Sequence, residues 1–485
     1  MNEYLTFDDV LLVPQYSDIL PKDVLLNSKF SRQISLKVPI ISAAMDKVTE
    51  HEMAIALALE GGLGIIHKNL TPEKQADEIR LVKRFENGFI DNPITVSPKA
   101  KVEEIYKIFL EKDYEKVPVL DENKKLLGLI TELDWFWPHD KSKKVKDIMT
   151  PIDKLTVAKD NINLSQANKM IREKNLSILC VVDKKGCLKS VVTRRDLEKN
   201  KEYPNSNKDK NKSLLVGAAI GVGDFELERA RLLVDAGVDC LVLDSAHGHS
   251  KNIMEMVKIL KKDKITKNID VVAGNIATKK AVVDLIKTGV DGIKVGIGPG
   301  SICTTRVVAG IGVPQLSAIM EAKKGLGKKD VPIIADGGIK YSGDIVKALA
   351  AGANSVMLGN ILAGAEESPG ETEFFNGRMY KIYRGMGSIS AMKKGSKDRY
   401  GQSNVNDDAK FVPEGIEGKI LYRGKLEKIL YQLIGGLKSG MSYNGSKNIS
   451  ELQKKAEFIR VTNASFKESH PHDIEITKEA PNYYL

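Results

Sequence analysis

Short apolar runs recur along most of the chain, and each is followed by small or polar residues and then by an amphipathic stretch. Runs of this length and composition are typical of buried strands. They lie at residues 39–43, 63–67, 214–220, 240–245, 270–275, 292–297, 331–336 and 355–358. Strands that alternate with helices predict a parallel α/β fold. Eight equal units without a change in pattern favour a closed (β/α)8 barrel over a doubly wound open sheet.

The stretch after the third run illustrates the predicted helices. Ala230 and Leu233 fall on one apolar face at helical spacing, whereas Glu226 and Arg229 are expected mostly on the other faces. Gly237 then occupies the position at which helices commonly end. The same order of strand, helix and glycine recurs along the barrel units.

The eight units follow one another only if residues 91–210 are set aside as an insertion. This insertion contains an internal repeat, because Thr131 and Asp134 close its first half as Thr193 and Asp196 close its second. Each half carries a predicted helix and two short strands. The predicted organisation is therefore 1–90 for the first part of the barrel, 91–150 and 151–205 for the two halves of the module, and 206–485 for the rest. The polar stretch 199–213 is expected to be a flexible return linker.

Composition limits the classes of function. The chain has 485 residues, of which 42% are hydrophobic and 28% charged, and a net charge of +10. Its lysines are interspersed with glutamates, so the basic balance suits anionic small molecules better than nucleic acid as the main partner. Four cysteines without a CxxC pair indicate a reducing compartment. No early apolar run resembles a signal peptide and none is long enough to span a membrane, so a cytoplasmic location is expected.

One glycine-rich stretch stands out as candidate chemistry. Residues 292–306 read GIKVGIGPGSICTTR, an apolar run followed by glycines at spacing two and then by a cysteine flanked by hydroxyls and an arginine. Glycines let a ligand approach the main chain closely. A cysteine held in such a loop is well placed to act as a nucleophile. Spacing alone leaves a second interpretation open, in which Cys303 is a small buried packing residue.

Other polar residues gather where the predicted strands end, which is where a barrel binds its ligands. They are Asp244, Ser245, His247 and His249; Asn275; Asp336, Gly337 and Gly338; and Gly359 and Asn360. The ends of the last two strands lie where barrels often bind phosphate. Two histidines at spacing two, without further ligands, do not predict a metal site. Beyond the barrel, residues 383–388 could surround an anion, and the polar stretch 393–412 could be a mobile lid, although its composition favours a solvated loop.

Several motifs together resemble the inosine-5′-monophosphate dehydrogenase family. They are FDDVLLVP, GIGPGSICTTR, DGGIKYSGD, YRGMGS, GSKDRY and PEGIEG, and the resemblance covers essentially the whole chain. It implies a TIM barrel with an inserted tandem CBS (Bateman) domain. It also implies NAD-dependent oxidation of IMP to XMP, the committed step of guanine nucleotide biosynthesis.

The resemblance assigns roles to individual residues. Cys303 would attack C2 of the hypoxanthine ring and form a covalent thioimidate, and Thr305 would handle a proton. Arg399 with Tyr400, on a mobile flap, would activate the water that hydrolyses this intermediate. An arginine base is unusual because the guanidinium pKa is normally above about 12, so the residue that accepts the proton stays open.

The resemblance also implies three binding sites. The IMP site would comprise Ser301, Asp336, Gly337, Gly338, Gly359, Asn360, Tyr383, Arg384, Gly385, Met386, Gly387 and Glu414. The NAD site would comprise Asp244, Ser245, Gly296, Ile297 and Gly298. A monovalent cation, usually K⁺, would be bound by Gly298, Gly300 and Cys303, with Glu468, Ser469 and His470 from a neighbouring subunit. A site shared between subunits implies a homotetramer, which could pair into an octamer.

Two features depart from the family pattern. The family more often has serine at position 360, and Ser190 replaces the glycine found at Gly128 in the first half of the module. The CBS pair is expected to bind regulatory purine nucleotides near Thr131, Asp134, Thr193 and Asp196. The nearest alternative is a GMP reductase-like purine nucleotide oxidoreductase, which is expected to lack both the CBS insertion and the Arg-Tyr flap. A nucleotide-sensing regulator built on the CBS pair is a third interpretation.

Overall fold

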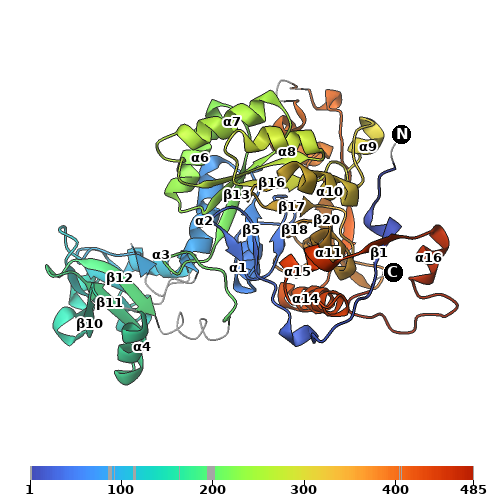
Figure 1. Cartoon of the computed structure of the whole chain (residues 1–485). Helices are drawn as coiled ribbons and strands as arrows, with labels where there is room; N and C mark the ends of the chain where they lie inside the picture. Colours follow the sequence, from blue (N-terminus) through green and yellow to red (C-terminus); the bar gives the residue numbers. More distant parts are fainter. Residues whose placement is uncertain are drawn as a thin grey trace. The chain divides into compact units, whose positions relative to one another are not determined.

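The computed structural model divides the chain into two compact units. It describes residues 3–85, 90–91, 93–112, 116–162, 164–193, 203–402, 405 and 407–483. The first unit comprises residues 1–83, 205–209 and 214–485, and the second comprises residues 84–204 and 210–213. Figure 1 shows both units, coloured along the sequence.

Eight parallel strands of the first unit form a closed barrel. In sequence order they are β4 (Ile40–Ser42), β5 (Leu63–Ile66), β13 (Val216–Ile220), β14 (Cys240–Asp244), β15 (Asp270–Ile276), β16 (Gly292–Val295), β17 (Ile333–Asp336) and β18 (Ser355–Leu358). The pairings of β18 with β4 and of β5 with β13 close the barrel across the insertion. The predicted (β/α)8 barrel is confirmed, and each strand overlaps one predicted apolar run.

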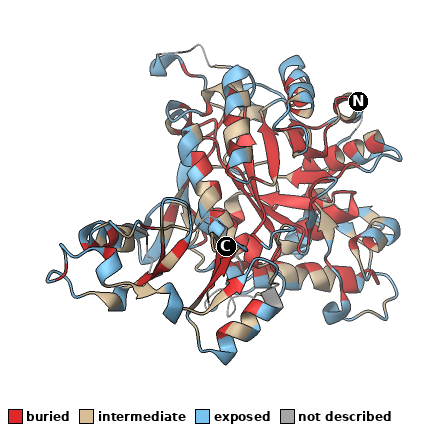
Figure 2. Cartoon of the chain, turned by 90° about the vertical axis from the view of Figure 1, so that its left-hand side faces the viewer, coloured by how far each residue is buried: buried red, intermediate tan, exposed pale blue. Residues whose placement is uncertain are grey.

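The barrel is buried on both sides, as its continuous apolar strands require. Ile41, Leu63, Val242, Val272 and Met357 meet in one core cluster, and Figure 2 shows the strands as buried. Helices surround them (Figure 1). The helices that connect the strands are α1 (His51–Leu59), α2 (Pro72–Arg84), α6 (Asp224–Asp235), α7 (Lys251–Lys262), α8 (Lys279–Ile286), α10 (Gln315–Leu326) and α11 (Ser342–Ala350).

Helix α6 departs from its prediction. Ala230 and Leu233 are buried as expected, but Glu226 and Arg229 are buried too. They pair with each other at 3.1 Å, and Arg229 also donates to the side-chain oxygen of Gln75 at 2.9 Å. Periodicity placed these charges on exposed faces because it does not register that two opposite charges can be buried together.

The remaining elements of this unit lie before and after the barrel strands. Two short pairs involve the N-terminal segment: β1 (Val10–Leu12) with β22 (Phe458–Arg460), and β2 (Ser28–Lys29) with β3 (Ser35–Leu36). An antiparallel sheet contains β19 (Thr372–Phe375), β20 (Arg378–Arg384) and β21 (Glu417–Leu421). The other helices are α9 (Thr305–Val308), α12 (Asn360–Ala363), α13 (Ile389–Lys393), α14 (Leu426–Tyr443), α15 (Ile449–Lys455) and α16 (Asn463–Glu468). The short 3-10 helices are η1 (Phe7–Asp9), η2 (Pro21–Asp23), η6 (Ser396–Tyr400) and η7 (Asp408–Lys410).

The second unit contains the internal repeat. Its first half has α3 (Val102–Lys112), β7 (Lys116–Leu120), β8 (Leu126–Thr131) and β9 (Thr150–Pro151), with η3 (Glu132–Asp134), η4 (Val145–Asp147) and η5 (Ile152–Lys154). Its second half has β10 (Val157–Lys159), α4 (Leu164–Glu173), β11 (Ile178–Val182) and β12 (Leu188–Thr193), with β6 (Ile90–Asp91) paired to β12. A helix followed by an antiparallel strand pair therefore occurs twice.

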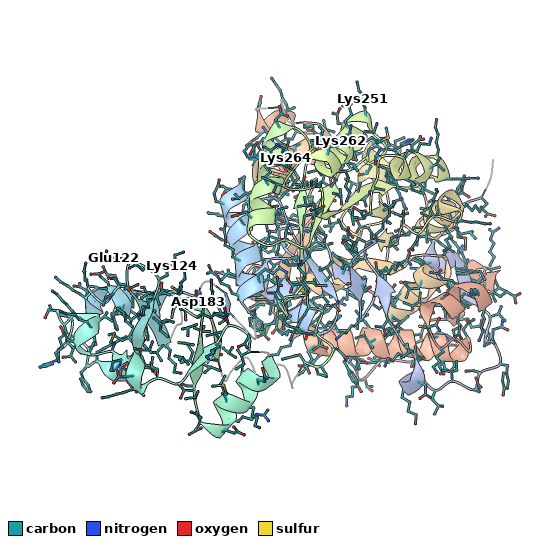
Figure 3. The ribbon with its side chains drawn as sticks, turned by 60° about the vertical axis from the view of Figure 1, so that its left-hand side comes forward. Glu122, Lys124, Asp183, Lys251, Lys262 and Lys264 are labelled. Carbon is teal, nitrogen blue, oxygen red and sulfur yellow. The ribbon has the colours of Figure 1, made fainter. Side chains whose placement is uncertain are left out.

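The hairpin turns of the two halves use the same chemistry. Asp121 accepts the backbone N–H groups of Asn123 and Lys125, and Asp183 accepts those of Lys185 and Cys187. Glu122, Lys124 and Asp183 from these turns are labelled in Figure 3. In the first half, Asp134 accepts the backbone N–H of Thr131 at 2.6 Å. The matching Asp196 lies outside the described residues.

Candidate active site

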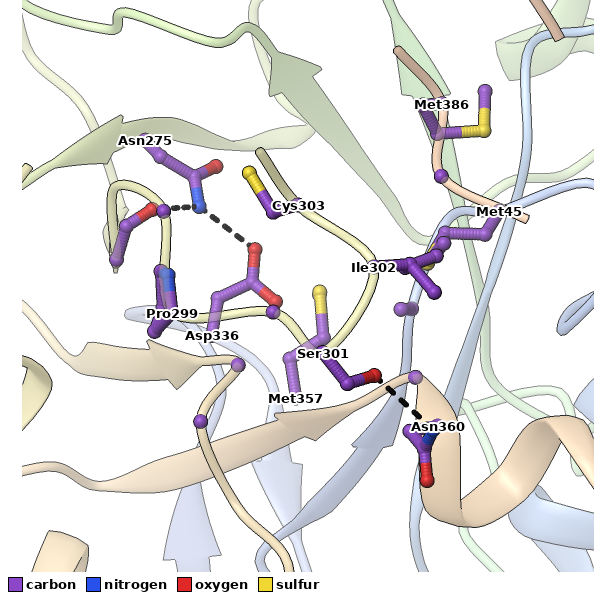
Figure 4. Close-up of a pocket in the computed structure, with 18 of the residues that line it drawn as sticks. Met45, Asn275, Pro299, Ser301, Ile302, Cys303, Asp336, Met357, Asn360 and Met386 are labelled. Atoms are coloured by element: carbon purple, nitrogen blue, oxygen red, sulfur yellow. Dashed lines mark hydrogen bonds between the residues drawn. The ribbon is translucent and has the colours of Figure 1, made fainter. Parts of the chain in front are cut away.

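A cavity of about 360 Å³ lies at the carboxyl end of the barrel. Residues within or just after β4, β14, β15, β16, β17 and β18 line it, together with residues from 383–386, 399–400, 414 and 423. Figure 4 shows part of this lining, with Cys303, Asn275, Asp336 and Ser301 labelled. The polar strand ends that the sequence singles out therefore meet in one pocket.

The loop that carries the cysteine requires its glycines. A Cβ on Gly296 would lie 2.1 Å from the carbonyl oxygen of Asp336, and one on Gly298 would lie 2.6 Å from Arg306. Both also have positive φ angles, 148° and 79°. Arg306 contacts the loop by donating through Nε to the carbonyl of Ile297 at 3.2 Å. Burial of the Arg306 side chain lowers the pKa of its guanidinium.

Cys303 is partly exposed in this pocket and is connected to a carboxylate. Its Sγ lies 3.2 Å from Oγ1 of Thr305, which donates to Oε2 of Glu414 at 2.7 Å. The chain of contacts gives the thiol proton a path through a hydroxyl to a carboxylate. By contrast, Cys180 and Cys240 are buried, and burial raises the pKa of the Cys180 thiol to about 12. Of the two interpretations of Cys303, the geometry favours the nucleophile.

A buried lysine forms part of the pocket lining. The side chain of Lys294 is 2% exposed, and its ammonium lies 2.9 Å from Oδ1 of Asp244 and 2.7 Å from Oδ2 of Asp336. The ammonium also contacts Asn275, whose amide donates to Asp336 at 2.8 Å. Lys294 was not predicted as a site residue, because it falls within an apolar run of the sequence. A single charge inside a buried strand is the signal that could have identified it.

The opposite part of the pocket combines glycines with hydroxyl and amide donors. Asn360 Nδ2 donates to Oγ of Ser301 at 3.1 Å (Figure 4). Gly337 and Gly338 have φ angles of 87° and 81°, so a side chain there would strain the backbone. Tyr383 is buried, and burial raises the pKa of its phenol, which therefore stays a hydrogen-bond donor.

Arg423 also lines the pocket and is not among the residues predicted from the sequence. It follows β21, outside every motif of the resemblance. Its backbone N–H donates to the carbonyl of Gly364 at 2.8 Å, next to the end of α12.

Residues 396–401, here called the covering segment, contribute two more side chains. The guanidinium of Arg399 pairs with the carboxylate of Asp244, and its carbonyl accepts the N–H of Ala246 at 3.3 Å. Tyr400 lines the pocket and packs against Gly387, and burial raises the pKa of its phenol. The polar composition favoured a solvated loop here, and for the covering segment that expectation is wrong.

Five of the residues assigned to the catalytic, IMP, NAD and cation sites do not line this cavity. Arg384 is buried and forms an ion pair with Asp46, which accepts from its Nε at 3.2 Å. Burial opposes ionisation of Asp46, but the hydrogen bond and charge of Arg384 hold the pKa of that carboxyl below its ordinary value. Gly387 contacts Tyr400 instead of the cavity. The last three lie at the end of α16 and just beyond it: Glu468, Ser469 and His470.

His247 and His249 follow β14 and do not line the cavity. His249 Nε2 contacts Oδ2 of Asp284 at 3.1 Å, and the rings of His247 and His249 are 6.4 Å apart. Across the described ranges, no group of three or more histidine, cysteine or acidic side chains is arranged to hold a metal ion. Nor does any helix that the structure describes have the length and apolar character to cross a membrane.

Comparison with known proteins identifies relatives along the full chain. The family model described as IMP dehydrogenase / GMP reductase domain matches residues 4–472. The inosine-5′-monophosphate dehydrogenase of Aquifex aeolicus is 54% identical, with 100% of this chain and 98% of the relative covered. Those of Helicobacter pylori and Staphylococcus aureus are each 52% identical, with 99–100% of this chain and 98–99% of the relatives covered.

A solved structure is also similar over the whole length. A variant of GMP reductase from Trypanosoma brucei, in complex with guanosine 5′-monophosphate, superposes with a TM-score of 0.90 at 40% identity. The superposition covers 98% of this chain and 99% of that chain, so it includes the inserted unit. The expectation that a GMP reductase lacks the insertion is therefore wrong for this relative, and the insertion does not distinguish the two activities.

Proposed function

The chain belongs to the IMP dehydrogenase / GMP reductase family, and on this premise we propose that it oxidises IMP to XMP with NAD⁺ as the hydride acceptor. The observation that carries the proposal is the hydrogen-bonded chain from Cys303 through Thr305 to Glu414 inside the pocket. Relatives that are 50–54% identical along the full chain and named for IMP oxidation favour this activity over GMP reduction.

The first half of the reaction begins with the thiolate of Cys303. The proton of the Cys303 thiol passes through Thr305 toward Glu414, and the thiolate that results adds through its sulfur to C2 of the hypoxanthine ring. The hydride at C2 then leaves with its electron pair to NAD⁺, which gives NADH and a thioimidate bond between C2 and sulfur. The hydride needs an acceptor in line with C2, and the side of the pocket at Asp244 and Ser245 is where the nicotinamide riboside would be held.

The second half requires water at the same carbon. Arg399 forms an ion pair with Asp244 when the covering segment packs over the pocket. The covering segment and the cofactor would therefore compete for the carboxylate of Asp244. Once NADH leaves, Arg399 and Tyr400 orient the water that adds to C2. The C–S bond then breaks, XMP is released and Cys303 is restored as a thiol or thiolate.

The IMP phosphate would lie among Ser301, Gly337, Gly338, Gly359, Asn360 and Tyr383. These supply neutral hydrogen-bond donors, and Arg423 adds a positive charge at the pocket wall. Asp336 would accept the ribose hydroxyls. Met386 and the backbone of Gly385 would line the base. Arg384 supports this wall through Asp46 and not by contact with substrate.

A monovalent cation suits the cysteine loop by the chemistry of its donors. The carbonyl oxygens of Gly298, Gly300 and Cys303 are neutral, hard ligands of the kind that bind K⁺. The remaining ligands, Glu468, Ser469 and His470, would come from a second subunit of a homotetramer. The inserted unit would be a CBS pair that binds purine nucleotides, and the protein would act in the cytoplasm.

The test is turnover combined with mass spectrometry. Purified protein with IMP, NAD⁺ and K⁺ should produce NADH, and protein quenched during turnover should carry a purine nucleotide on Cys303. Cys303→Ala should abolish both signals, whereas Cys187→Ala, which removes a partly exposed thiol of the inserted unit, should change neither. Consumption of NADPH with GMP, in the absence of IMP oxidation, would instead establish the reductase activity.

A further inference from the structure

Lys68 is a buried cation that the proposed chemistry does not use. It follows β5 at the carboxyl end of the barrel, and its side chain is 5% exposed. Its ammonium donates to Oδ2 of Asp398, which lies in the covering segment. The two residues are separated by 330 positions in the sequence, and Lys68 does not line the pocket. Burying a lysine removes its charge from water, which is costly unless a partner compensates the charge. The pairing of Lys68 with Asp398 therefore calls for a structural explanation.

Gly221 provides room for the same carboxylate. It follows β13, the strand next to β5, and a Cβ at this position would lie 2.9 Å from Oδ2 of Asp398. Its φ angle is outside the positive range, so the turn itself does not require glycine. The two neighbouring strand ends therefore form a socket, in which Lys68 supplies the charge and Gly221 supplies the space.

The charges around the socket are balanced. Glu226 approaches Gly221 as well, accepting its N–H at 2.6 Å, and would repel a second carboxylate. Arg229 pairs with Glu226 at 3.1 Å and offsets that charge. Lys68 is thus left to compensate Asp398, which explains why this lysine remains at a site with little access to water.

Asp398 transmits the contact to the residue that follows it. While Oδ2 accepts from Lys68, Oδ1 accepts the backbone N–H of Arg399 at 2.8 Å. The backbone at Arg399 is therefore fixed directly by the carboxylate that Lys68 holds. From this position the guanidinium reaches Asp244, and Tyr400 enters the pocket.

We propose that Lys68 and Asp398 form a latch that holds the covering segment down, and that Lys68 is a positioning residue for the hydrolytic half of the reaction. The inference rests on the proposed function, because it requires a covalent intermediate that water must cleave. It assigns Lys68 no contact with IMP or with the cofactor. Loss of the latch should therefore slow the step that needs Arg399 and Tyr400 and spare the step that produces NADH.

Two single variants test the latch, with a third as the matched control. Lys68→Met and Asp398→Asn each remove one charge of the pair. Asp408→Asn removes the partner of Lys393 at 3.0 Å, an exposed ion pair in the same polar stretch. In stopped-flow experiments with IMP and NAD⁺, the first-turnover burst of NADH should keep its rate and amplitude in all three proteins. Steady-state turnover should fall about 10- to 100-fold in the two latch variants, since misplacing a reacting group by about 1 Å has effects of that size.

The covalent intermediate gives an independent readout. Protein quenched in the steady state should carry the nucleotide on Cys303 in a larger fraction of molecules for Lys68→Met and Asp398→Asn than for wild type or Asp408→Asn. The double variant should lose no more turnover than either single one, because both remove the same interaction. Gly221→Ala should behave like Asp398→Asn, since the added methyl group occupies the socket.

The outcomes separate the inference from the proposed function. Wild-type protein that makes no NADH from IMP would overturn the function itself. If the wild type turns over but the latch variants lose burst rate and steady-state rate to the same extent, the latch is overturned. The latch is also overturned if Asp398→Asn has the same kinetics as Asp408→Asn. Thermal unfolding of each variant identifies loss of fold. If Lys68→Met does not fold, Asp398→Asn still tests the latch, because Asp398 is partly exposed on the covering segment.

Discussion

The barrel contains the same arrangement of charges at both of its ends. At the carboxyl end, Lys294 lies between Asp244 and Asp336, at 2.9 and 2.7 Å. At the amino end, Lys83 lies between Asp239 and Asp209, at 2.6 and 3.1 Å. Each cluster is one lysine with two aspartates, and each is shielded from solvent. The two clusters therefore share one central lysine and two aspartates, and they differ in position and in the contacts that Arg399 and Asn275 add at the carboxyl end.

Position determines what each cluster can do. Asp239 precedes β14 and accepts the backbone N–H of Val216 at 2.8 Å, so the amino-end cluster joins the starts of neighbouring strands. None of its members lines the cavity, whereas Lys294 and both of its aspartates do. In a parallel barrel all strands end on the same side, so only the carboxyl-end cluster has a ligand to contact. Burial and pairing alone, without location, would not distinguish a functional cluster from a structural one.

The largest expected effect comes from removing each central lysine. Lys294→Met leaves two buried carboxylates without their shared cation, and breaking such a pair typically destabilises a protein by about 3–5 kcal/mol. It should also abolish IMP binding, because Asp336 would lose the ammonium that holds its carboxylate in place. Lys83→Met should reduce stability by a smaller amount, since its cluster is more accessible to water, and should leave IMP binding and turnover intact. Urea unfolding and isothermal titration calorimetry with IMP measure the two effects separately.

Equal loss of activity in the two lysine variants would contradict the comparison. In that event the clusters would act only through the stability of the barrel. Lys294→Met that still binds IMP with wild-type affinity would contradict it as well, because the carboxyl-end cluster would then have no role in the pocket.

A smaller effect is expected from the hydroxyl that connects Cys303 with Glu414. Thr305→Val removes the hydroxyl that contacts both Sγ at 3.2 Å and Oε2 at 2.7 Å. Proton transfer by a positioned side chain is typically worth a factor of about 100 or more, so turnover should fall by that order. Thr305→Ser keeps the hydroxyl and should retain most of the activity. Both variants should unfold at the wild-type temperature, in contrast to Lys294→Met; a serine variant as slow as the valine variant would exclude the relay.

The barrel could be predicted from sequence because its signal is local. Each strand is a short apolar run with polar neighbours, and the eight runs appear in order once the insertion is removed. The carboxyl-end cluster could not be predicted in this way. Lys294 is 50 positions from Asp244 and 42 from Asp336, and the pairing of β14, β15, β16 and β17 side by side brings the three side chains together. The Lys68–Asp398 pair spans 330 positions and is equally invisible to a local pattern.

Side-chain direction set a second limit on prediction. Tyr383 and Arg384 are adjacent in a motif of the resemblance, and both were candidate IMP contacts. They lie on β20, where successive side chains point to opposite faces. Tyr383 therefore faces the cavity, while Arg384 turns to Asp46. A motif identifies a segment, but the pleat of the strand decides which of its residues meets the ligand.

The smallest effect is expected from a charged pair that lies near the carboxyl end of the barrel but outside the lining of the pocket. His51, at the start of α1, contacts Glu78 of α2 at 2.7 Å, and neither residue lines the cavity. The hydrogen bond to Glu78 raises the pKa of His51 above its ordinary value of 6.5, although burial opposes this. The folded state thus binds the proton more tightly than the unfolded chain. The resulting stabilisation is fully present below pH 6.5 and is lost as the pH rises through the higher pKa of the folded state.

His51→Asn keeps a neutral hydrogen-bond donor near the place of Nδ1 and removes the charge. The wild type should therefore be more stable than this variant at pH 6, by no more than about 1 kcal/mol for a partly exposed pair, and the difference should vanish by about pH 9. Turnover should be the same in both proteins at every pH, because neither residue of the pair lines the pocket. A variant with altered kinetics would mean that proximity to the carboxyl end is sufficient for a functional role, and the distinction drawn from the two lysine clusters would then have to rest on distance from the pocket and not on contact with it.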